Sequence, residues 1–153
     1  MKLRSDVISA LMLIILLVSP SRAHAQATDA DAVLKAREAA LPGRDPDAVL
    51  TLFAEDAIVV TSSGRLLIGR EQIRVWVQDQ VDRRQREEAG PRQVHGNKLS
   101  WPGKVHRDDW HKLGVSPLDV TQDAIIQGGK IKFFSTTFTP ESWLRLEAAR
   151  KKK

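Results

Sequence analysis

The segment Val120–Phe138, with the sequence VTQDAIIQGGKIKFFSTTF, decides the fold of this chain. Both of its halves are rich in β-branched and aromatic residues, which favour strands, and only Gly128 and Gly129 separate them. Two glycines between two such runs are typical of a tight β-hairpin. We therefore predict an antiparallel pair of strands over residues 120–127 and 130–138.

The sequence on either side of this hairpin extends the pattern. After it, Thr139 and Pro140 are typical of the N-cap and first turn of a helix. Turn residues and β-branched residues also alternate before it. There we predict strands over 93–101 and 104–112, a turn at Pro102-Gly103 and a connection over 113–118.

The first half of the chain has helical periodicity instead. In the longest predicted helix, over 69–88, apolar residues recur at helical spacing and the other face is charged. We interpret those charges as surface pairs four residues apart, such as Arg83 with Glu87. The other predicted elements are a helix over 29–41, a helix beginning at Asp45-Pro46, a strand over 57–61 and a short strand over 65–68.

Helices in the first half and an antiparallel sheet in the second half predict an α+β domain, with helices packed on one face of a curved sheet. The chain contains no cysteine. Disulfides, thiolate metal sites and a cysteine nucleophile are therefore excluded.

The N-terminus is typical of a secretory signal peptide. Lys2 and Arg4 precede an apolar run over Val7–Val18, and the small-x-small sequence Ala23-His24-Ala25 follows it. A run of this length is shorter than the about 20 residues that a helix needs to cross a bilayer. We expect residues 1–25 to be removed, so that the exported protein begins at Gln26 and has no stable membrane anchor. Its location would be periplasmic or extracellular, and intact-mass measurement would show the new N-terminus. An uncleaved N-terminal anchor is the alternative.

Removal of this leader leaves one predicted domain over residues 26–150 and a basic tail over 151–153. The leader holds three of the 24 basic residues and one of the 19 acidic residues, so a net charge of +3 remains. The three lysines of the tail account for it. Because the folded part is balanced in charge, nucleic acid is not expected as a partner.

Three segments are informative together, in this order and spacing: LFAEDA at Leu52–Ala57, LIGREQI at Leu67–Ile73 and GKI at Gly129–Ile131. With them the chain resembles the nuclear-transport-factor-2-like (NTF2-like) superfamily, and within it the SnoaL-like proteins. The resemblance implies a cone-shaped curved antiparallel sheet packed against N-terminal helices, with a short C-terminal helix. It also implies a pocket between sheet and helices, and a homodimer formed through the outer face of the sheet.

The same resemblance points to site residues. Ketosteroid isomerases of this fold have an aspartate base at the end of the first strand, where this chain has Thr61, and they use a tyrosine, which this chain lacks. Limonene epoxide hydrolases use an arginine and an aspartate at a spacing that Arg107 and Asp109 reproduce, and a second acid at the position of Thr136. Neither catalytic set is complete, so the resemblance does not specify a reaction.

The candidate site residues follow from strand geometry. If residues 104–112 form a regular strand, Arg107 and Asp109 share one face, and the family arrangement turns that face into the cone. Asp123 interrupts an apolar strand, so it lies either at a solvated strand end or in the pocket. The candidate catalytic residues are Arg107, Asp109 and Asp123, and the candidate ligand-binding residues are Thr61, Trp76 and Thr136.

Histidines add little to this set. His106 could assist as a base beside Asp108, which would share its strand face. No cofactor and no metal are expected, because His95, His106 and His111 match no established metal-binding spacing.

These observations favour an exported SnoaL-like domain with an apolar pocket for a small organic ligand, with or without catalysis. One alternative is a cyclase, isomerase or hydrolase that uses the Arg107–Asp109 pair in the pocket. The other alternative is a dimerising interaction module.

Overall fold

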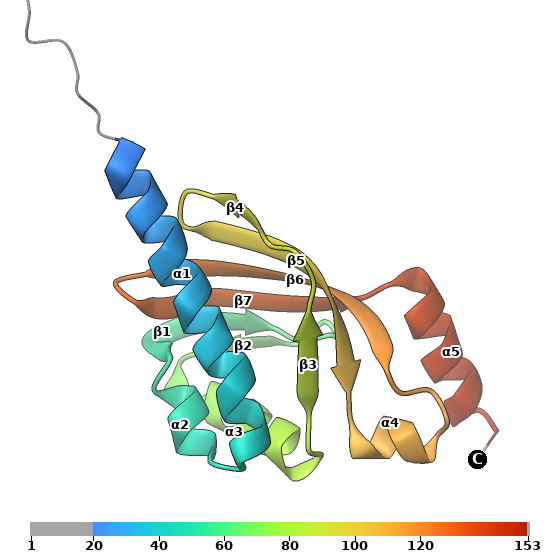
Figure 1. Ribbon diagram of the computed structural model, residues 1–153. Coiled ribbons are helices and arrows are strands. Elements are labelled where there is room, and N and C mark those ends of the chain that lie inside the picture. Colours follow the sequence, from blue (N-terminus) through green and yellow to red (C-terminus); the bar gives the residue numbers. More distant parts are fainter. Residues whose placement is uncertain (1–19, 153) are drawn as a thin grey trace, which may run out of the picture.

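The structure is a computed structural model of the chain, and it describes residues 20–152. Most of the predicted signal peptide, residues 1–19, lies outside the described residues. The first helix, α1 (Pro20–Ala40), includes the predicted cleavage site, and its first turns project past the sheet (Figure 1). No helix among the described residues is long and apolar enough to cross a membrane.

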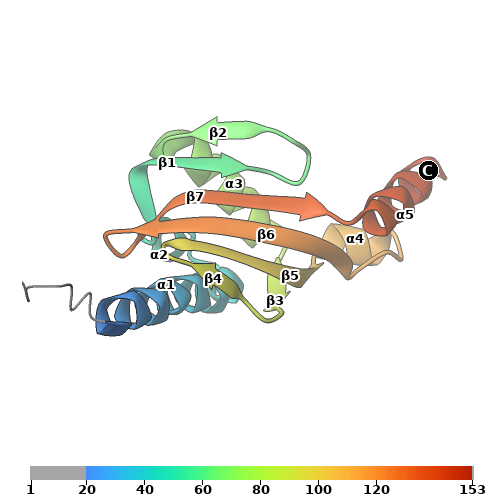
Figure 2. The same ribbon diagram turned by 90° about the horizontal axis from the view of Figure 1, so that it is seen from above.

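Seven strands form one curved sheet in the order β2-β1-β7-β6-β5-β3 (Figure 2). The seventh strand, β4, pairs with the first three residues of β5. All strand pairs are antiparallel except β1 with β7, which is parallel. The predicted α+β class is confirmed. The strands are β1 (Phe53–Val60), β2 (Leu66–Ile68), β3 (Arg86–Ala89), β4 (Gln93–His95), β5 (Lys98–His106), β6 (Leu118–Gln127) and β7 (Lys130–Phe138).

Helices cover the concave face and the far end of this sheet (Figure 1). The second helix begins where the sequence predicts, because the Asp45 side chain accepts hydrogen bonds from the backbone N–H groups of Asp47 and Ala48. Thr139 caps the last helix in the same way. The helices after α1 are the short 3-10 helix η1 (Leu41–Gly43), α2 (Pro46–Leu50), α3 (Arg70–Asp82), α4 (Asp108–Lys112) and α5 (Pro140–Arg150).

The predicted β6–β7 hairpin is confirmed. Its register runs from Val120 opposite Phe138 to Gln127 opposite Lys130. Gly128 and Gly129 both have positive φ, 58° and 69°. A two-residue hairpin turn with two positive φ angles strongly favours glycine, because a side chain is strained there.

The main core lies between the concave face of the sheet and the helices α1 and α3. It is built from alternate residues of the central strands and from the apolar stripes of both helices. A second, smaller core lies under α4 and α5. The main core includes Leu34, Val59, Ile73, Val77, Leu99, Trp101, Ala124 and Phe134.

The predicted turn at Pro102-Gly103 is wrong, because β5 runs through both residues. On one side β5 pairs with β6 throughout, and on the other side its partner changes: Ser100 lies opposite β4 and Gly103 opposite β3. Pro102 lies between these two partners, where its missing N–H leaves no gap in a ladder. The actual turn is at Gly96, where φ is 65°.

The predicted strand over 104–112 is also wrong in its second half. The chain leaves the sheet after His106, and α4 begins at Asp108. Two acidic residues in the first turn of α4 and two basic residues in its last turn complement the helix dipole, and Trp110 is buried beneath it. Helical packing therefore overrides the strand pattern here.

The helix predicted over 69–88 corresponds to α3 and ends earlier than predicted. Arg84 adopts φ of 50° and the backbone N–H of Gln85 bonds to the carbonyl of Gln80, which closes α3. Glu87 therefore lies on β3 instead of the helix, so its predicted surface pair with Arg83 does not form.

Candidate functional site

A buried ion pair occupies the interior of the cone, between α1 and β3. Arg37 on α1 donates to both carboxylate oxygens of Glu87 on β3, with Nη1–Oε2 at 2.8 Å and Nη2–Oε1 at 3.1 Å. The two side chains are 1% and 2% exposed. Burial of two charges is costly unless they are paired and hydrogen-bonded, so the site requires both residues together.

Two glutamines complete the hydrogen bonding of this carboxylate. Gln122 on β6 donates to Oε2 at 3.0 Å and Gln85 donates to Oε1 at 2.7 Å. Burial alone would raise the pKa of Glu87, but the charge of Arg37 and these hydrogen bonds outweigh it and hold the pKa below its usual value. A carboxylate with four donors and a lowered pKa is better suited to holding these partners in place than to accepting a proton at neutral pH.

Aromatic rings enclose the guanidinium of Arg37. Its carbon atom Cζ lies 4.2 Å from the ring centre of Phe134 and 5.8 Å from that of Trp76. Both distances are within the range of cation–π attraction. Arg37, Glu87 and the rings therefore lie between the sheet and the helices, where the sequence predicts an apolar pocket.

An open cleft of about 600 Å³ lies beside this cluster, between β2 and α3. Trp76 separates the two regions, since it lines the cleft and also packs on Phe134, with ring centres 6.0 Å apart. The lining is half polar and half apolar: Arg65, Leu66, Leu67, Gln72, Val75, Trp76 and Asp79.

Arg107 and Asp109 do pair, although they do not share a strand. The Nε and Nη2 atoms of Arg107 lie 3.1 and 3.2 Å from the two oxygens of Asp109. Arg107 also reaches Asp79, which lines the cleft, and Arg83 joins Asp79 to Asp109. The pair therefore belongs to a four-residue network at the edge of the cleft.

This network is only partly buried, with Arg107 15% and Asp109 34% exposed. Burial would raise the pKa of Asp109, but its hydrogen bond with Arg107 and the charges of Arg107 and Arg83 lower it on balance. Loss of Asp109 would leave Arg107 with Asp79 as a partner. The network is consequently redundant, unlike the Arg37–Glu87 pair.

Asp123 does not enter the cone. It lies opposite Ser100 and Ser135, on the outer face of the sheet, and accepts a hydrogen bond from Ser135 at 3.3 Å. Its neighbours Gln122 and Ala124 are the residues that point inward and are buried. Of the two placements that the sequence leaves open for Asp123, the one inside the cone is therefore excluded, because the register puts Gln122 on the inner face instead.

The three predicted ligand-binding residues lie in different surroundings. Trp76 lines the cleft. Thr136 lies opposite Gln122 and so on the inner face. The hydroxyl group of Thr61 is engaged in the β1–β2 turn, where it accepts from the backbone N–H of Arg65 and contacts the hydroxyl of Ser63.

The predicted pair of His106 with Asp108 does not form. His106 Nε2 lies 2.8 Å from Glu88 Oε1, and Asp108 pairs with Arg84. Residues 20–152 contain no group of three side chains that could hold a metal ion.

Sequence reasoning missed the residues of the interior cluster. One signal was available for Arg37, because it lies on the apolar side of its helix beside Leu34 and Leu41. No comparable signal existed for Glu87, because it follows a charged helix face in the sequence. None existed for Gln122 either, because the sequence does not show which face of its strand points inward.

No protein-family model matches the chain, and no curated protein matches it. Solved structures do match. An epoxide hydrolase/cyclase-like enzyme of pyran ring formation in salinomycin has a TM-score of 0.65 and 13% identity, over 76% of this chain and 95% of that one. A Sinorhizobium meliloti protein assigned as a polyketide cyclase has 0.58 and 25%, over 69% and 93%.

A third match is an NTF2-like protein of unknown function from Cytophaga hutchinsonii, with a TM-score of 0.60 and 12% identity over 75% of this chain and 94% of that one. The fold predicted from the sequence is thus confirmed: the chain has the NTF2-like fold. Its structural neighbours include proteins assigned as a polyketide cyclase and as a ketosteroid isomerase.

Proposed function

We propose that this protein is a small-molecule-binding domain whose ligand occupies the cleft between β2 and α3. The cleft is large enough for a small organic molecule. Leu66, Val75 and Trp76 offer an apolar wall, while Gln72 and Asp79 offer polar groups. We therefore expect an amphipathic ligand instead of the wholly apolar one that the sequence suggests.

One observation favours binding over acid–base catalysis: each carboxylate at the site is paired with arginine. Glu87 pairs with Arg37, and Asp79 and Asp109 pair with Arg83 and Arg107. The pKa values of Glu87 and Asp109 are lowered. A general base works best with a pKa near the working pH, so these carboxylates suit structure and ligand orientation better than proton transfer.

The test is a substitution on the exposed wall of the cleft. Val75→Arg should weaken binding of the neutral fluorescent probe N-phenyl-1-naphthylamine about tenfold or more, because a charge then faces the apolar part of the ligand. Val75 is 71% exposed, so the fold should tolerate the change. The measurement is a fluorescence titration.

Leu144→Arg is the matched control, since Leu144 is 67% exposed on α5, away from the cleft. Its affinity for the probe should equal that of the unmodified protein. Equal affinity in the Val75 variant would place the binding site elsewhere, and no binding by the unmodified protein would argue against the proposal.

We also propose a homodimer formed through the outer face of the sheet. Ile58 on β1 and Ile68 on β2 lie opposite each other on this face and are 37% and 56% exposed, and such apolar patches are typical of interfaces. Sedimentation equilibrium should give the mass of two chains, and Ile68→Lys should give the mass of one. A single-chain mass for the unmodified protein at micromolar concentration would contradict the dimer.

A further inference from the structure

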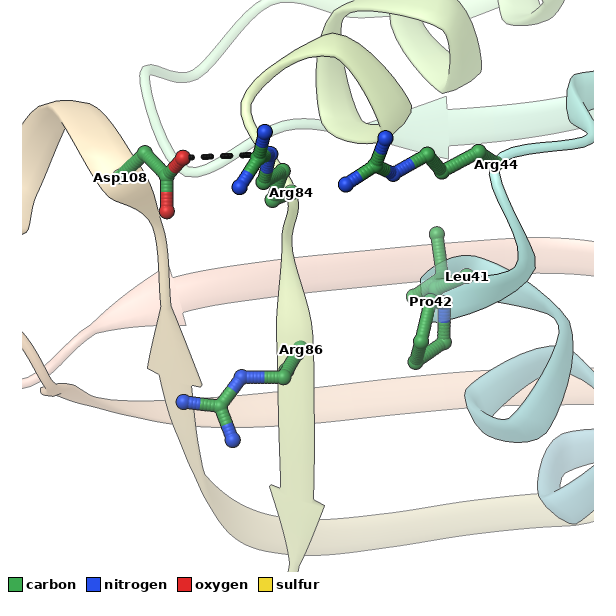
Figure 3. Close-up of a pocket in the computed structure, with 6 residues that line it drawn as sticks. All are labelled: Leu41, Pro42, Arg44, Arg84, Arg86 and Asp108. Atoms are coloured by element: carbon green, nitrogen blue, oxygen red, sulfur yellow. Dashed lines mark ion pairs between the residues drawn. The ribbon is translucent and has the colours of Figure 1, made fainter.

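Three arginines line a second, separate depression of about 230 Å³, which shares no lining residue with the cleft. They come from three places in the chain: the end of η1, the α3–β3 connection and β3 (Figure 3). The lining consists of Leu41, Pro42, Arg44, Arg84, Arg86 and Asp108.

The depression carries an excess of positive charge. Arg84 Nε lies 3.5 Å from Asp108 Oδ2, an exposed and long ion pair. Arg44 and Arg86 have no ion-pair partner among residues 20–152. Three guanidinium groups thus line the depression with one carboxylate, and this excess of positive charge attracts an anion.

The backbone at two of these arginines is unusual. Arg44 and Arg84 have φ of 59° and 50°, and within the described part of the chain they are the non-glycine residues with positive φ. Both follow the end of a helix, where glycine adopts this conformation with less strain. Strained positions of this kind cluster at functional sites. The folded chain alone gives Arg44 neither an ion pair nor a relaxed backbone.

We propose that Arg44, Arg84 and Arg86 form a binding site for a small oxyanion of the phosphate or sulfate class, either free or as the end group of an organic molecule. Guanidinium groups match the oxygens of such an anion with paired N–H donors. Leu41 and Pro42 line the other side of the depression (Figure 3). Pro42 is exposed and Leu41 is buried behind it, so Pro42 gives the apolar surface for the organic part of a phosphomonoester.

The experiment measures the melting temperature with inorganic phosphate, sulfate or phenyl phosphate, against chloride at the same ionic strength. A ligand that binds the folded state raises the melting temperature. We expect a rise with phosphate and sulfate over chloride, and a larger rise with phenyl phosphate if the site takes an organic end group. An equal rise with phosphate and phenyl phosphate would assign the site to the free anion.

Arg84→Gly separates ligand binding from folding. Glycine suits φ of 50°, so the melting temperature without anion should stay the same or increase. The rise with phosphate should disappear. Asp108→Asn removes the one acidic group of the site and should strengthen phosphate binding several-fold.

Arg65→Gln is the control, because Arg65 also has no ion-pair partner in the described residues but lines the cleft instead. It should keep the full response to phosphate. A response that survives in Arg84→Gly, that disappears equally in Arg65→Gln, or that chloride reproduces would overturn the proposal. Binding of N-phenyl-1-naphthylamine should be unchanged in Arg84→Gly, which keeps this test independent of the cleft.

Discussion

Glu87→Leu is expected to lower the free energy of unfolding by about 3–5 kcal/mol, because it leaves the buried charge of Arg37 without its carboxylate. The side chain of Arg37 is 1% exposed, so water cannot replace the lost partner. Gln122 and Gln85 also lose their acceptor. Urea titration of the single variant measures the loss.

Two further variants are needed to interpret the loss of stability in Glu87→Leu. Glu88→Gln is the control, since Glu88 is the next residue on β3 and its side chain is 61% exposed; it should cost less than about 0.5 kcal/mol. The double variant Arg37→Met with Glu87→Leu should recover the part of the loss that comes from the unpaired charge of Arg37, because an apolar pair replaces both charges, whereas Gln122 and Gln85 still lack their acceptor. A loss under about 1 kcal/mol for Glu87→Leu would show that Arg37 reaches water.

The same pair predicts the direction of the pH dependence. The pKa of Glu87 is lower in the folded state than in the unfolded chain, so its contribution to stability is fully present above the unfolded pKa, about 4.3. That contribution is lost as the pH falls through the folded pKa. The double variant should therefore lose less stability than the unmodified protein when the pH is lowered below about 4.

Arg92→Met is expected to have the second largest effect, about 2–3 kcal/mol. Arg92 is 9% exposed and donates to Asp31 at 2.5 Å and to Glu38, both on α1. Its guanidinium also lies 5.1 Å from the ring centre of Trp101. The cost is smaller than at Glu87 because the two carboxylates left behind, 29% and 17% exposed, regain some solvent.

Hydrogen exchange can locate the part of the fold that this loss of stability affects. Arg92 joins the β3–β4 connection to α1, so the amide groups of α1 after Asp31 should exchange faster in Arg92→Met. Lys35→Met is the control, because Lys35 is 68% exposed and also pairs with Asp31; it should leave both stability and exchange unchanged. Uniform acceleration across the sheet would mean that Arg92 supports the whole domain and not the docking of α1.

Local patterns in the sequence were enough for the architecture. The hairpin at Gly128-Gly129 depends on two residues that can adopt positive φ. The helix start at Asp45 depends on one side chain that bonds to the next backbone N–H groups. Both effects act over a few residues, so they can be read from the sequence.

The candidate site was less predictable, because a small change in where a helix ends or in which face of a strand points inward changes which side chains are buried. An α3 that ends at Asp82 instead of Glu88 moves Glu87 from a solvated helix face to a buried strand. One position along β6 exchanges Asp123 for Gln122. The pairing of Arg107 with Asp109 was anticipated, but its setting, a helix N-terminus at the cleft edge, was not.

The sequence by itself therefore determined the α+β fold and the order of its main elements, because turns, caps and periodicity are local. Only the tertiary structure decided the contents of the cone. Arg37 and Glu87 are 50 residues apart and Gln122 is a further 35 away, and burial forces them together since none of the three could be satisfied there alone.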